Sequence, residues 1–291
     1  MKIACAQYPI GKFAGLADWH ANAARWVEEA AEAGAKLLVF PEYGGMELTS
    51  LLPEPLQKDL RGQIAALAEF HAGYAETYAA LARQHGVHIL APSLPVKTGE
   101  TFHNRAYFFA PGGTAFQEKR QMTRFESEQW GIGGGGELKI FDIGEAKIGI
   151  AICYDIEFPL VAHAMAAAGA DLILAPSCTD TQAGANRVHV GARARALENQ
   201  VYVAVAPTVG EAPWSPAVDS NTGWAAVYAT PDIGFPDDGT LARGEPDKPG
   251  WVTAELDFDL LRRARRQAQV FTRADWDSQH RPSLQVIETR F

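Results

Sequence analysis

The chain has 291 residues, of which 47% are hydrophobic and 21% charged, as in an ordinary globular protein. Its formal net charge of −9 argues against nucleic-acid binding, because neutralising phosphates requires a surplus of Lys and Arg. No uninterrupted apolar stretch approaches the length of a membrane span, and the first residues do not resemble a signal peptide. Three cysteines are too few for a disulfide framework, so we expect free thiols and a cytoplasmic protein.

Short apolar runs alternate with longer helical patterns, which predicts an α/β fold. In the first half we expect a helix over 18–34, with Asp18 as its N-cap and Gly34 just beyond its end. A second helix is expected over roughly 60–85, ending at Gly86. Length and β-rich content predict four strands in this half, at 3–7, 36–42, 87–93 and 105–111.

The second half begins with a predicted hairpin over 138–153, two apolar runs around a Gly-Glu turn. We expect a helix beginning near Pro159 and another around 187–200. Strands are predicted at 171–177, 201–207 and 223–229. Residues 230–250, rich in Pro, Gly and Asp, are predicted to form a loop, and the segment from 253 onward one strand, one short helix and an irregular tail.

One pattern occurs twice, at 31–43 and 167–178: a helix end, Gly-Ala, a charged residue, an apolar run and a proline. The repeat suggests two similar layers, with sheet packed on sheet and helices outside, although any α/β protein can repeat such a turn. No linker typical of a domain boundary occurs. We therefore expect one domain over 1–291, with about 25 residues as a C-terminal tail.

Several familiar site patterns are poorly supported. The Gly-rich stretch 131–136 formally matches a dinucleotide fingerprint, but a strand-like run follows it where a helix is required, so we expect a loop. His85 and His88 are separated by Gly86, and no zinc-ligand or G-x-S-x-G pattern occurs. The Arg-rich segment 187–198 is more typical of a salt-bridged helix face than of an anion site.

Three ionisable residues end their own segments, most of them apolar runs: Glu42, Lys119 and Cys153. Strand ends are where α/β folds place chemistry. Each residue has an ordinary structural explanation as a helix cap, a solvated lysine or a core cysteine. Together they suffice for acyl transfer, because a carboxylate in a dry pocket can accept a thiol proton and a lysine can stabilise an oxyanion.

These residues lie in three segments, "FPEYG" (40–44), "EKRQMTRFE" (118–126) and "CYDIEFP" (153–159). The three resemble, in order and spacing, the motif regions of the nitrilase superfamily of carbon–nitrogen hydrolases. The resemblance covers some two-thirds of the chain, from the first residues to about 206. It implies an αββα sandwich that forms a homodimer or a higher homo-oligomer.

The resemblance also implies roles for individual residues. The family's catalytic glutamate, lysine and cysteine match Glu42, Lys119 and Cys153. A second glutamate, which orients the lysine, falls at Glu126 rather than at Glu128. The oxyanion would be held by the lysine and by the backbone N–H of the residue after the nucleophile, Tyr154. Neither a metal nor another cofactor is implied.

Two departures from the family's patterns bear on the substrate. True nitrilases usually carry Trp-Glu after the cysteine, whereas Tyr154 and Asp155 follow here, as in amidase-like and carbamoylase-like branches. This favours a primary amide or an N-carbamoyl amine over a nitrile. Glu157 stands where branches acting on carboxylate-bearing substrates have arginine, which predicts a neutral or cationic substrate. Alternatively, Glu157 faces away and caps the helix that begins at Pro159.

Other residues and other functions stay open at this point. Trp130 and Cys178 are candidate substrate-binding residues, while Phe158 and Trp214 fit a pocket wall or the core equally well. The alternatives to amide hydrolysis are conversion of a nitrile to an acid, acyl transfer to an acceptor other than water, and a catalytically silent binding protein on the same fold. Such a silent protein would be expected to lack one of the three catalytic residues, and all three are present.

Overall fold

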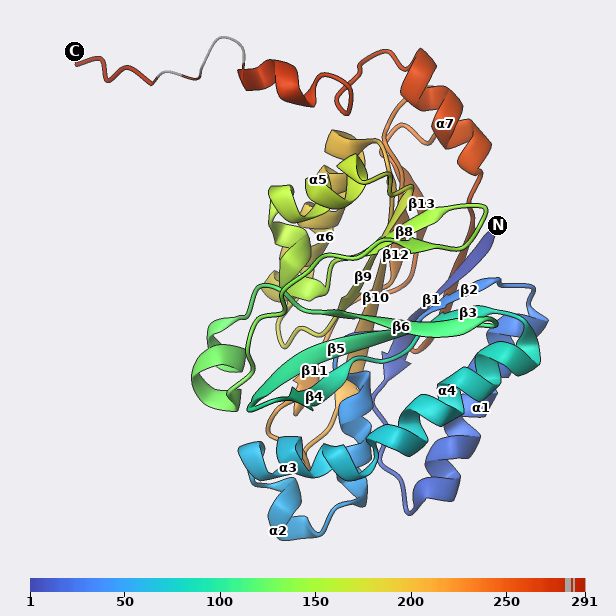
Figure 1. The fold of residues 1–291 in the computed structure, drawn as a ribbon, viewed down its shortest axis with the longest axis vertical. Coiled ribbons are helices and arrows are strands. Elements are labelled where there is room, and N and C mark those ends of the chain that lie inside the picture. Colours follow the sequence, from blue (N-terminus) through green and yellow to red (C-terminus); the bar gives the residue numbers. More distant parts are fainter. Residues whose placement is uncertain (281–283, 285, 291) are drawn as a thin grey trace.

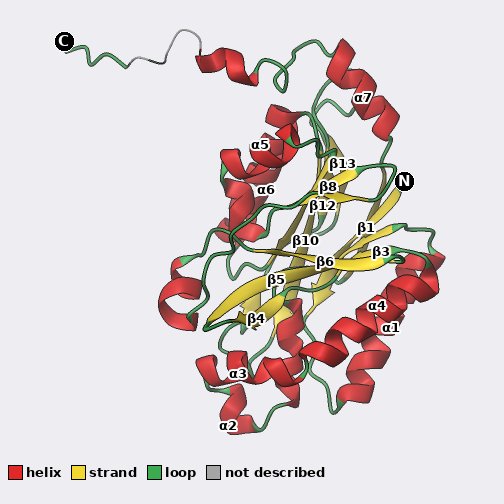
Figure 2. Cartoon of the chain, viewed as in Figure 1, coloured by secondary structure: helices red, strands yellow, loops and turns green. Residues whose placement is uncertain are grey.

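The computed structural model describes residues 1–280, 284 and 286–290. Its strands form two mixed layers that face each other, and helices cover the outer side of each (Figure 1, Figure 2). The layers join where β1 (Lys2–Pro9) and β10 (Tyr202–Glu211) pair in parallel at their ends. The predicted α/β fold with an αββα sandwich is confirmed.

The first layer is built around β1, which pairs with β2 in parallel and with β14 in antiparallel orientation. Its other strands are β2 (Leu37–Val39), β3 (His88–Leu90), β4 (Leu94–Thr98), β5 (Thr101–Ala110), β6 (Gly113–Glu118) and β14 (Gly250–Glu255). Helices α1 (Leu16–Glu32) and α4 (His71–His85) cover it. Ile3 and Cys5 of β1 pack toward the second layer, whereas Ala4 and Ala6 pack toward the helices, the period of two that a strand imposes.

The second layer has three parallel strands at its centre, β8, β9 and β10. Its strands besides β10 are β7 (Phe141–Asp142), β8 (Lys147–Ile150), β9 (Leu172–Ser177), β12 (Ala226–Tyr228) and β13 (Thr240–Arg243), with β11 (Ser220–Asn221) paired to the end of β10. Helices α5 (Pro159–Ala167) and α6 (Gln182–Asn199) cover it. All six residues of β9 are buried, as expected of a strand covered on both faces.

The repeated pattern corresponds to one helix–strand unit in each layer, α1–β2 and α5–β9. After each helix the chain turns through a glycine with a left-handed backbone, Gly34 (φ 86°) and Gly169 (φ 101°). The strand that follows pairs in parallel with its neighbour, β1 or β8. The repeat therefore reflects two equivalent units in opposing layers.

Two helix predictions in the first half need correction. The N-cap of α1 is Gly15, and Asp18 lies in the first turn, where a carboxylate favours the positive end of the helix dipole. The helix expected over 60–85 is broken into α3 (Leu60–Ala66), a 3₁₀ turn η2 (Leu67–Glu69) and α4. At the break the side chain of Leu67 is fully buried in the core. Neither glycine nor proline marks the break in the sequence.

The second half differs from expectation at two places. Helix α6 begins five residues earlier than predicted, because the Thr181 hydroxyl accepts a hydrogen bond from the Gly184 N–H (3.1 Å) and caps it. The expected loop 230–250 contains β13, which pairs with β12. The hairpin β7–β8 and the start of α5 at Pro159 agree with the predictions.

The remaining elements connect the layers or follow them. Before α3 come the 3₁₀ helix η1 (Gly44–Leu51) and α2 (Glu54–Gln57), and after β14 come α7 (Phe258–Gln267) and η5 (Trp276–His280). Part of the predicted C-terminal tail, 281–283, 285 and 291, lies outside the described residues. Among the described helices none is both long enough and apolar enough to cross a membrane.

Candidate active site

A pocket of about 690 Å³ opens where strands of both layers end. Glu42 follows β2, Lys119 follows β6, Cys153 follows β8 and Cys178 follows β9, and all four line this pocket. The edge formed by carboxyl ends of strands is the usual place for a ligand site in an α/β fold. The strand-end residues singled out in the sequence therefore meet in one cavity.

The segment after β2 is held rigidly where it enters the pocket. The Thr208 hydroxyl donates a hydrogen bond to the carbonyl of Glu42 (2.6 Å), and the N–H of Tyr43 donates to the Ser93 hydroxyl (2.9 Å). Tyr43 has a left-handed backbone, with φ 53°. A non-glycine residue in this region is strained, so the surrounding contacts must fix it.

Cys153 is the first residue of the 3₁₀ helix η4 (Cys153–Glu157), which begins just beyond β8. Its backbone is also left-handed, with φ 48°. Its thiol is 3.7 Å from the carbonyl oxygen of Cys178, to which it donates a weak hydrogen bond. Buried strand and strained turn together fix the position of this sulfur in the pocket.

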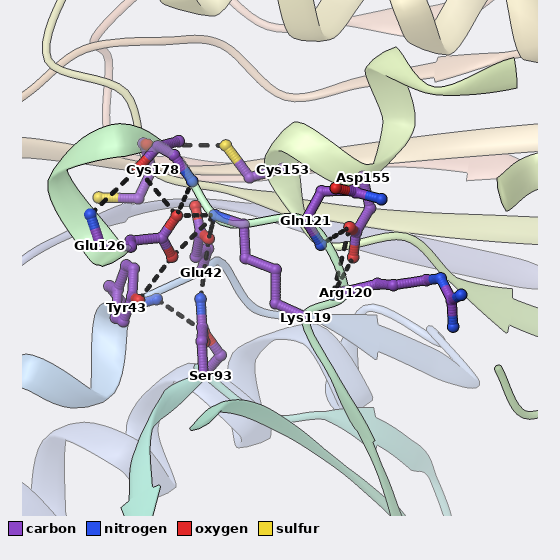
Figure 3. Close-up of polar contacts among 12 residues, drawn as sticks. Glu42, Tyr43, Ser93, Lys119, Arg120, Gln121, Glu126, Cys153, Asp155 and Cys178 are labelled. Atoms are coloured by element: carbon purple, nitrogen blue, oxygen red, sulfur yellow. Dashed lines mark hydrogen bonds and ion pairs between the residues drawn. The ribbon is translucent and has the colours of Figure 1, made fainter. Parts of the chain in front are cut away.

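Lys119 lies between the carboxylates of Glu42 and Glu126 (Figure 3) and lines the pocket. Its ammonium is 2.7 Å from Glu42 Oε1 and 2.7 Å from Glu126 Oε2, and its side chain is only 1% exposed. The Asn104 amide donates to Glu42 (2.9 Å), and the Tyr43 hydroxyl donates to Glu126 (2.7 Å). These hydrogen bonds satisfy carboxylate oxygens that would be costly to bury without partners.

The choice between the two neighbouring glutamates is decided by geometry. Glu126 lies in a short π-helical turn, η3 (Phe125–Trp130), which directs its side chain inward. Glu128 points to solvent and forms an ion pair with Arg124 (3.2 Å). Of these two glutamates, only Glu126 reaches Lys119.

Burial and neighbouring charges set the protonation states of Glu42, Lys119 and Glu126. Burial raises the pKa of Glu42 to about 7, although the Lys119 ammonium acts in the opposite direction. Burial also opposes ionisation of Lys119 and Glu126. The carboxylates of Glu42 and Glu126 nevertheless raise the pKa of Lys119, and the Lys119 ammonium lowers that of Glu126. Near neutrality Lys119 and Glu126 are therefore charged, and Glu42 can exchange a proton.

The Cys153 thiol is neutral at rest. Burial and the neighbouring Glu42 carboxylate raise the pKa of Cys153 well above its usual value, and Lys119 offsets this only in part. The thiol can thus become a nucleophile only as its proton moves to a base, and Glu42 is next to it.

Asp155 is buried but does not line the pocket. Its carboxylate accepts hydrogen bonds from the backbone N–H groups of Arg120 (3.0 Å) and Gln121 (2.7 Å). These residues directly follow Lys119, so Asp155 links the turn of the cysteine to the turn of the lysine. The side chain therefore acts on the alignment of these two turns and does not face the substrate.

The other predicted pocket residues are distributed as follows. Tyr154, Trp130 and Cys178 line the pocket, and Trp130 packs edge-on against Tyr43 with ring centroids 5.1 Å apart. The N–H of Tyr154 belongs to the first turn of η4, where helical N–H groups have no partner within the helix. Phe158 and Trp214 are absent from the lining.

Glu157 faces the pocket. It lines the cavity and forms an ion pair with Arg187 of α6 (3.6 Å). The cap of α5 is Phe158, without a side-chain hydrogen bond, so Glu157 does not cap that helix. Sequence reasoning placed Arg187 on a salt-bridged helix face and did not connect it with the pocket.

Arg195 of the same helix also serves the site, which the prediction of a salt-bridged helix face captured only in part. It pairs with Glu198 (2.8 Å) and donates to the carbonyl of Ile156 in η4 (3.2 Å). Gly191 permits this approach, because a Cβ there would lie 2.9 Å from the Ile156 carbonyl oxygen. Helix α6 therefore supports the turn that carries Cys153.

Asn104 and Thr208 are the other residues that sequence reasoning missed. Both side chains are fully buried within strands, Asn104 in β5 and Thr208 in β10. A polar residue in an apolar run, such as Thr208, is a usable signal because it must find a partner when buried, whereas Asn104 stands among polar neighbours in the sequence. Within the described residues, no group of three or more His, Cys, Asp or Glu side chains is arranged to hold a metal ion.

Two helix-covered sheets with a buried Glu–Lys–Glu cluster and a cysteine at their strand ends are typical of an acyl-transfer enzyme. Residues 2–266 match the family model described as carbon-nitrogen hydrolase. The chain therefore belongs to the carbon–nitrogen hydrolase family.

Individual relatives agree with this assignment. A probable hydrolase of Bacillus subtilis, YhcX, is 31% identical over 93% of this chain, although the chain spans only 52% of that relative. The omega-amidase NIT2-B of Xenopus laevis is 26% identical, with 92% of this chain and 91% of that protein covered. The crystal structure of Saccharomyces cerevisiae Nit3, a nitrilase superfamily member, has a TM-score of 0.70 at 21% identity, covering 91% of this chain and 93% of Nit3. The predicted superfamily resemblance is confirmed.

Proposed function

We propose that the protein hydrolyses the C–N bond of a small primary amide or N-carbamoyl amine through a thioester on Cys153, releasing ammonia. One observation carries this proposal. Lys119 lies 2.7 Å from each of two buried carboxylates in the same pocket as a cysteine thiol. The name of the omega-amidase relatives supports an amide as substrate.

Acylation begins when the Cys153 sulfur attacks the amide carbonyl carbon and its proton passes to Glu42. The C=O π bond opens, and the Lys119 ammonium and the backbone N–H of Tyr154 stabilise the resulting oxyanion. Protonated Glu42 then donates to the nitrogen, the C–N bond breaks, and ammonia leaves. The product is a thioester, and Glu42 is again a carboxylate.

Deacylation uses the same groups. Glu42 takes a proton from a water molecule while the oxygen of that water attacks the thioester carbon. When the tetrahedral intermediate collapses, the C–S bond breaks and the sulfur recovers the proton from Glu42. An amide leaves a carboxylic acid, and an N-carbamoyl amine leaves a carbamic acid that breaks down to the amine and CO2. Throughout, Glu126 keeps Lys119 charged and oriented, because it contributes one of the two close carboxylates (2.7 Å).

The test is to incubate the protein with primary amides, N-carbamoyl amines and nitriles, measure ammonia, and weigh the trapped acyl-enzyme. We expect ammonia from amides or N-carbamoyl amines, and an adduct that is absent in Cys153→Ala. An adduct that persists in Cys153→Ala and disappears in Cys178→Ala would show that the wrong nucleophile was chosen. Turnover of nitriles alone would favour the nitrilase alternative, and hydroxylamine as acceptor would reveal acyl transfer.

We also propose that the protein is a homodimer or a higher homo-oligomer. Helices α5 and α6 expose Leu160 (71%), Val190 (69%) and Leu197 (40%) on the outside of the second layer. Exposed apolar side chains gathered on neighbouring helices are typical of an interface. Light scattering should give a mass of at least two chains, and Val190→Glu should lower it.

A further inference from the structure

An ion pair of unequal partners borders the pocket. Glu157 and Arg187 lie 3.6 Å apart, but the glutamate side chain is 23% exposed and the arginine side chain 63%. Arg187 can turn its guanidinium into water at little cost, because an exposed ion pair contributes about 1 kcal/mol or less. Glu157 is more enclosed and would be left with an unpaired charge. The carboxylate is therefore the fixed partner and the guanidinium the replaceable one.

The charges that line the pocket favour a cation. Five carboxylates line it, against three basic side chains; the carboxylates are Glu42, Glu126, Glu157, Asp180 and Asp219. Glu42 and Glu126 share Lys119, while Asp180 and Asp219 form no ion pair within the described residues. A substrate carboxylate near Glu157 would meet like charges, whereas an ammonium would be attracted.

The distance from the nucleophile suits a small bifunctional molecule. Cys153 and Glu157 are the two ends of η4. At roughly 2 Å per residue of a 3₁₀ helix, their backbones are about 8 Å apart. A short alkyl chain bearing an amide at one end and an ammonium at the other spans this separation.

We infer that the pocket selects amides with a terminal ammonium group, which displaces Arg187 and pairs with Glu157. The inference rests on the proposed hydrolysis and adds the substrate class. Glu157 is the specificity residue, and Arg187 is the counter-ion that the substrate ammonium replaces. The lining also includes Tyr154 and Val188, the chain neighbours of Cys153 and Arg187, whose apolar surfaces suit the alkyl chain.

The test compares three amides with the same three-methylene chain: γ-aminobutyramide, valeramide and glutaramate, which end in ammonium, methyl and carboxylate. Hydrogen bonds to charged groups predict that kcat/KM for γ-aminobutyramide exceeds that for valeramide by about tenfold or more. Glutaramate should be the poorest of the three. Added salt should reduce the preference for the cation and leave valeramide unchanged.

Two variants separate the roles of the ion pair. Glu157→Gln should lower kcat/KM for γ-aminobutyramide about tenfold and leave valeramide within about twofold. Arg187→Gln should raise kcat/KM for γ-aminobutyramide by up to about fivefold, because no guanidinium has to be displaced. The matched control is Glu100→Gln, in an exposed pair with Lys97 (3.7 Å) outside the pocket, which should change none of the three substrates.

Each other outcome overturns the inference. Equal turnover of γ-aminobutyramide and valeramide, or an equal loss for all substrates in Glu157→Gln, removes the role of Glu157. A preference for glutaramate that is lost in Arg187→Gln assigns the pocket to a carboxylate instead. Turnover of propionamide but of none of the three also overturns it. If no amide or N-carbamoyl amine releases ammonia, the proposed function itself fails, which is a separate result.

Discussion

The two helix–strand units, α1–β2 and α5–β9, have the same backbone design and different chemistry. Each helix ends at a left-handed glycine, Gly34 or Gly169, and each strand runs into a proline, Pro41 or Pro176. The chain beyond each proline then reaches the same pocket. The two units therefore share the same backbone scaffold, and both lead to the same pocket.

The difference lies in the two residues after the proline. In the first unit these are Glu42 and Tyr43, which contact Lys119 and Glu126. In the second unit they are Ser177 and Cys178, both neutral. At these two positions the same scaffold thus delivers a buried carboxylate from one unit, here called the charged wall, and only uncharged side chains from the other. Position alone does not make a catalytic residue; the partners that reach it do.

Glu42→Gln against Ser177→Ala is the strongest test of this contrast. Glutamine cannot accept the thiol proton, so kcat/KM should fall by about 10³-fold or more. Ser177 occupies the equivalent position without charge, and its loss should change kcat/KM by less than about tenfold. Ammonia release and thermal melting of both variants give the result. Similar losses of kcat/KM in both variants would mean that the two positions contribute equally to catalysis.

The next pair of positions gives a smaller effect. Tyr43→Phe removes the hydroxyl that donates to Glu126 (2.7 Å) and should lower kcat about tenfold by loosening Lys119. Cys178→Ala, at the equivalent position, should change KM more than kcat, because Cys178 lines the pocket without contacting the lysine. Steady-state kinetics separates the two constants. A fall in kcat for Cys178→Ala alone would contradict this division.

The charged wall should also govern the dependence on pH. Glu42 must be ionised to accept a proton, and its pKa is raised to about 7, so kcat/KM should fall as the pH drops through 7. Asn104→Ala removes a donor to the ionised form (2.9 Å), so the acid limb should move up by about one pH unit. The measurement is the pH profile of kcat/KM for the wild type and for Asn104→Ala. A wild-type rate that stays constant down to pH 5 would exclude Glu42 as the base.

The shared part of the design predicts equal effects in the two units. Gly34→Ala and Gly169→Ala each place a side chain on a left-handed backbone, at φ 86° and 101°. Each should destabilise the protein by about 1 to 2 kcal/mol without changing kcat. Urea unfolding measures this. A loss confined to one glycine would show that the units are less equivalent than their backbones.

Much of this arrangement could be predicted from the sequence because strand ends are visible there. Glu42, Lys119 and Cys153 each close a short segment, and the repeated helix–strand pattern indicated the two layers. Glu126 came from the resemblance, since no local pattern shows that a π-helical turn directs it inward. The break between α3 and α4 had no signal at all, because packing of Leu67 decides it.

The residues that were missed depend on contacts between distant segments. Asn104 meets Glu42 across 62 positions of sequence, and Thr208 meets it across 166. Arg187 was assigned to a salt-bridged helix face, but its partner Glu157 lies in a separate segment, so its place at the pocket was not predicted. Whether Glu157 faces the pocket was undecided until the structure placed it beside Arg187 in the lining. Such pairs follow from register and helix phase, which a single sequence specifies weakly.

The left-handed backbone at Tyr43 and Cys153 has a consequence for engineering. A side chain on such a backbone destabilises the fold by about 1 to 2 kcal/mol. Glycine would relieve this strain at Cys153, whereas at Tyr43 it would also remove a buried ring that packs against Trp130. A selection for thermal stability alone would therefore enrich the Cys153→Gly variant, which is more stable but inactive. Libraries built from this scaffold should hold both positions constant and seek robustness elsewhere.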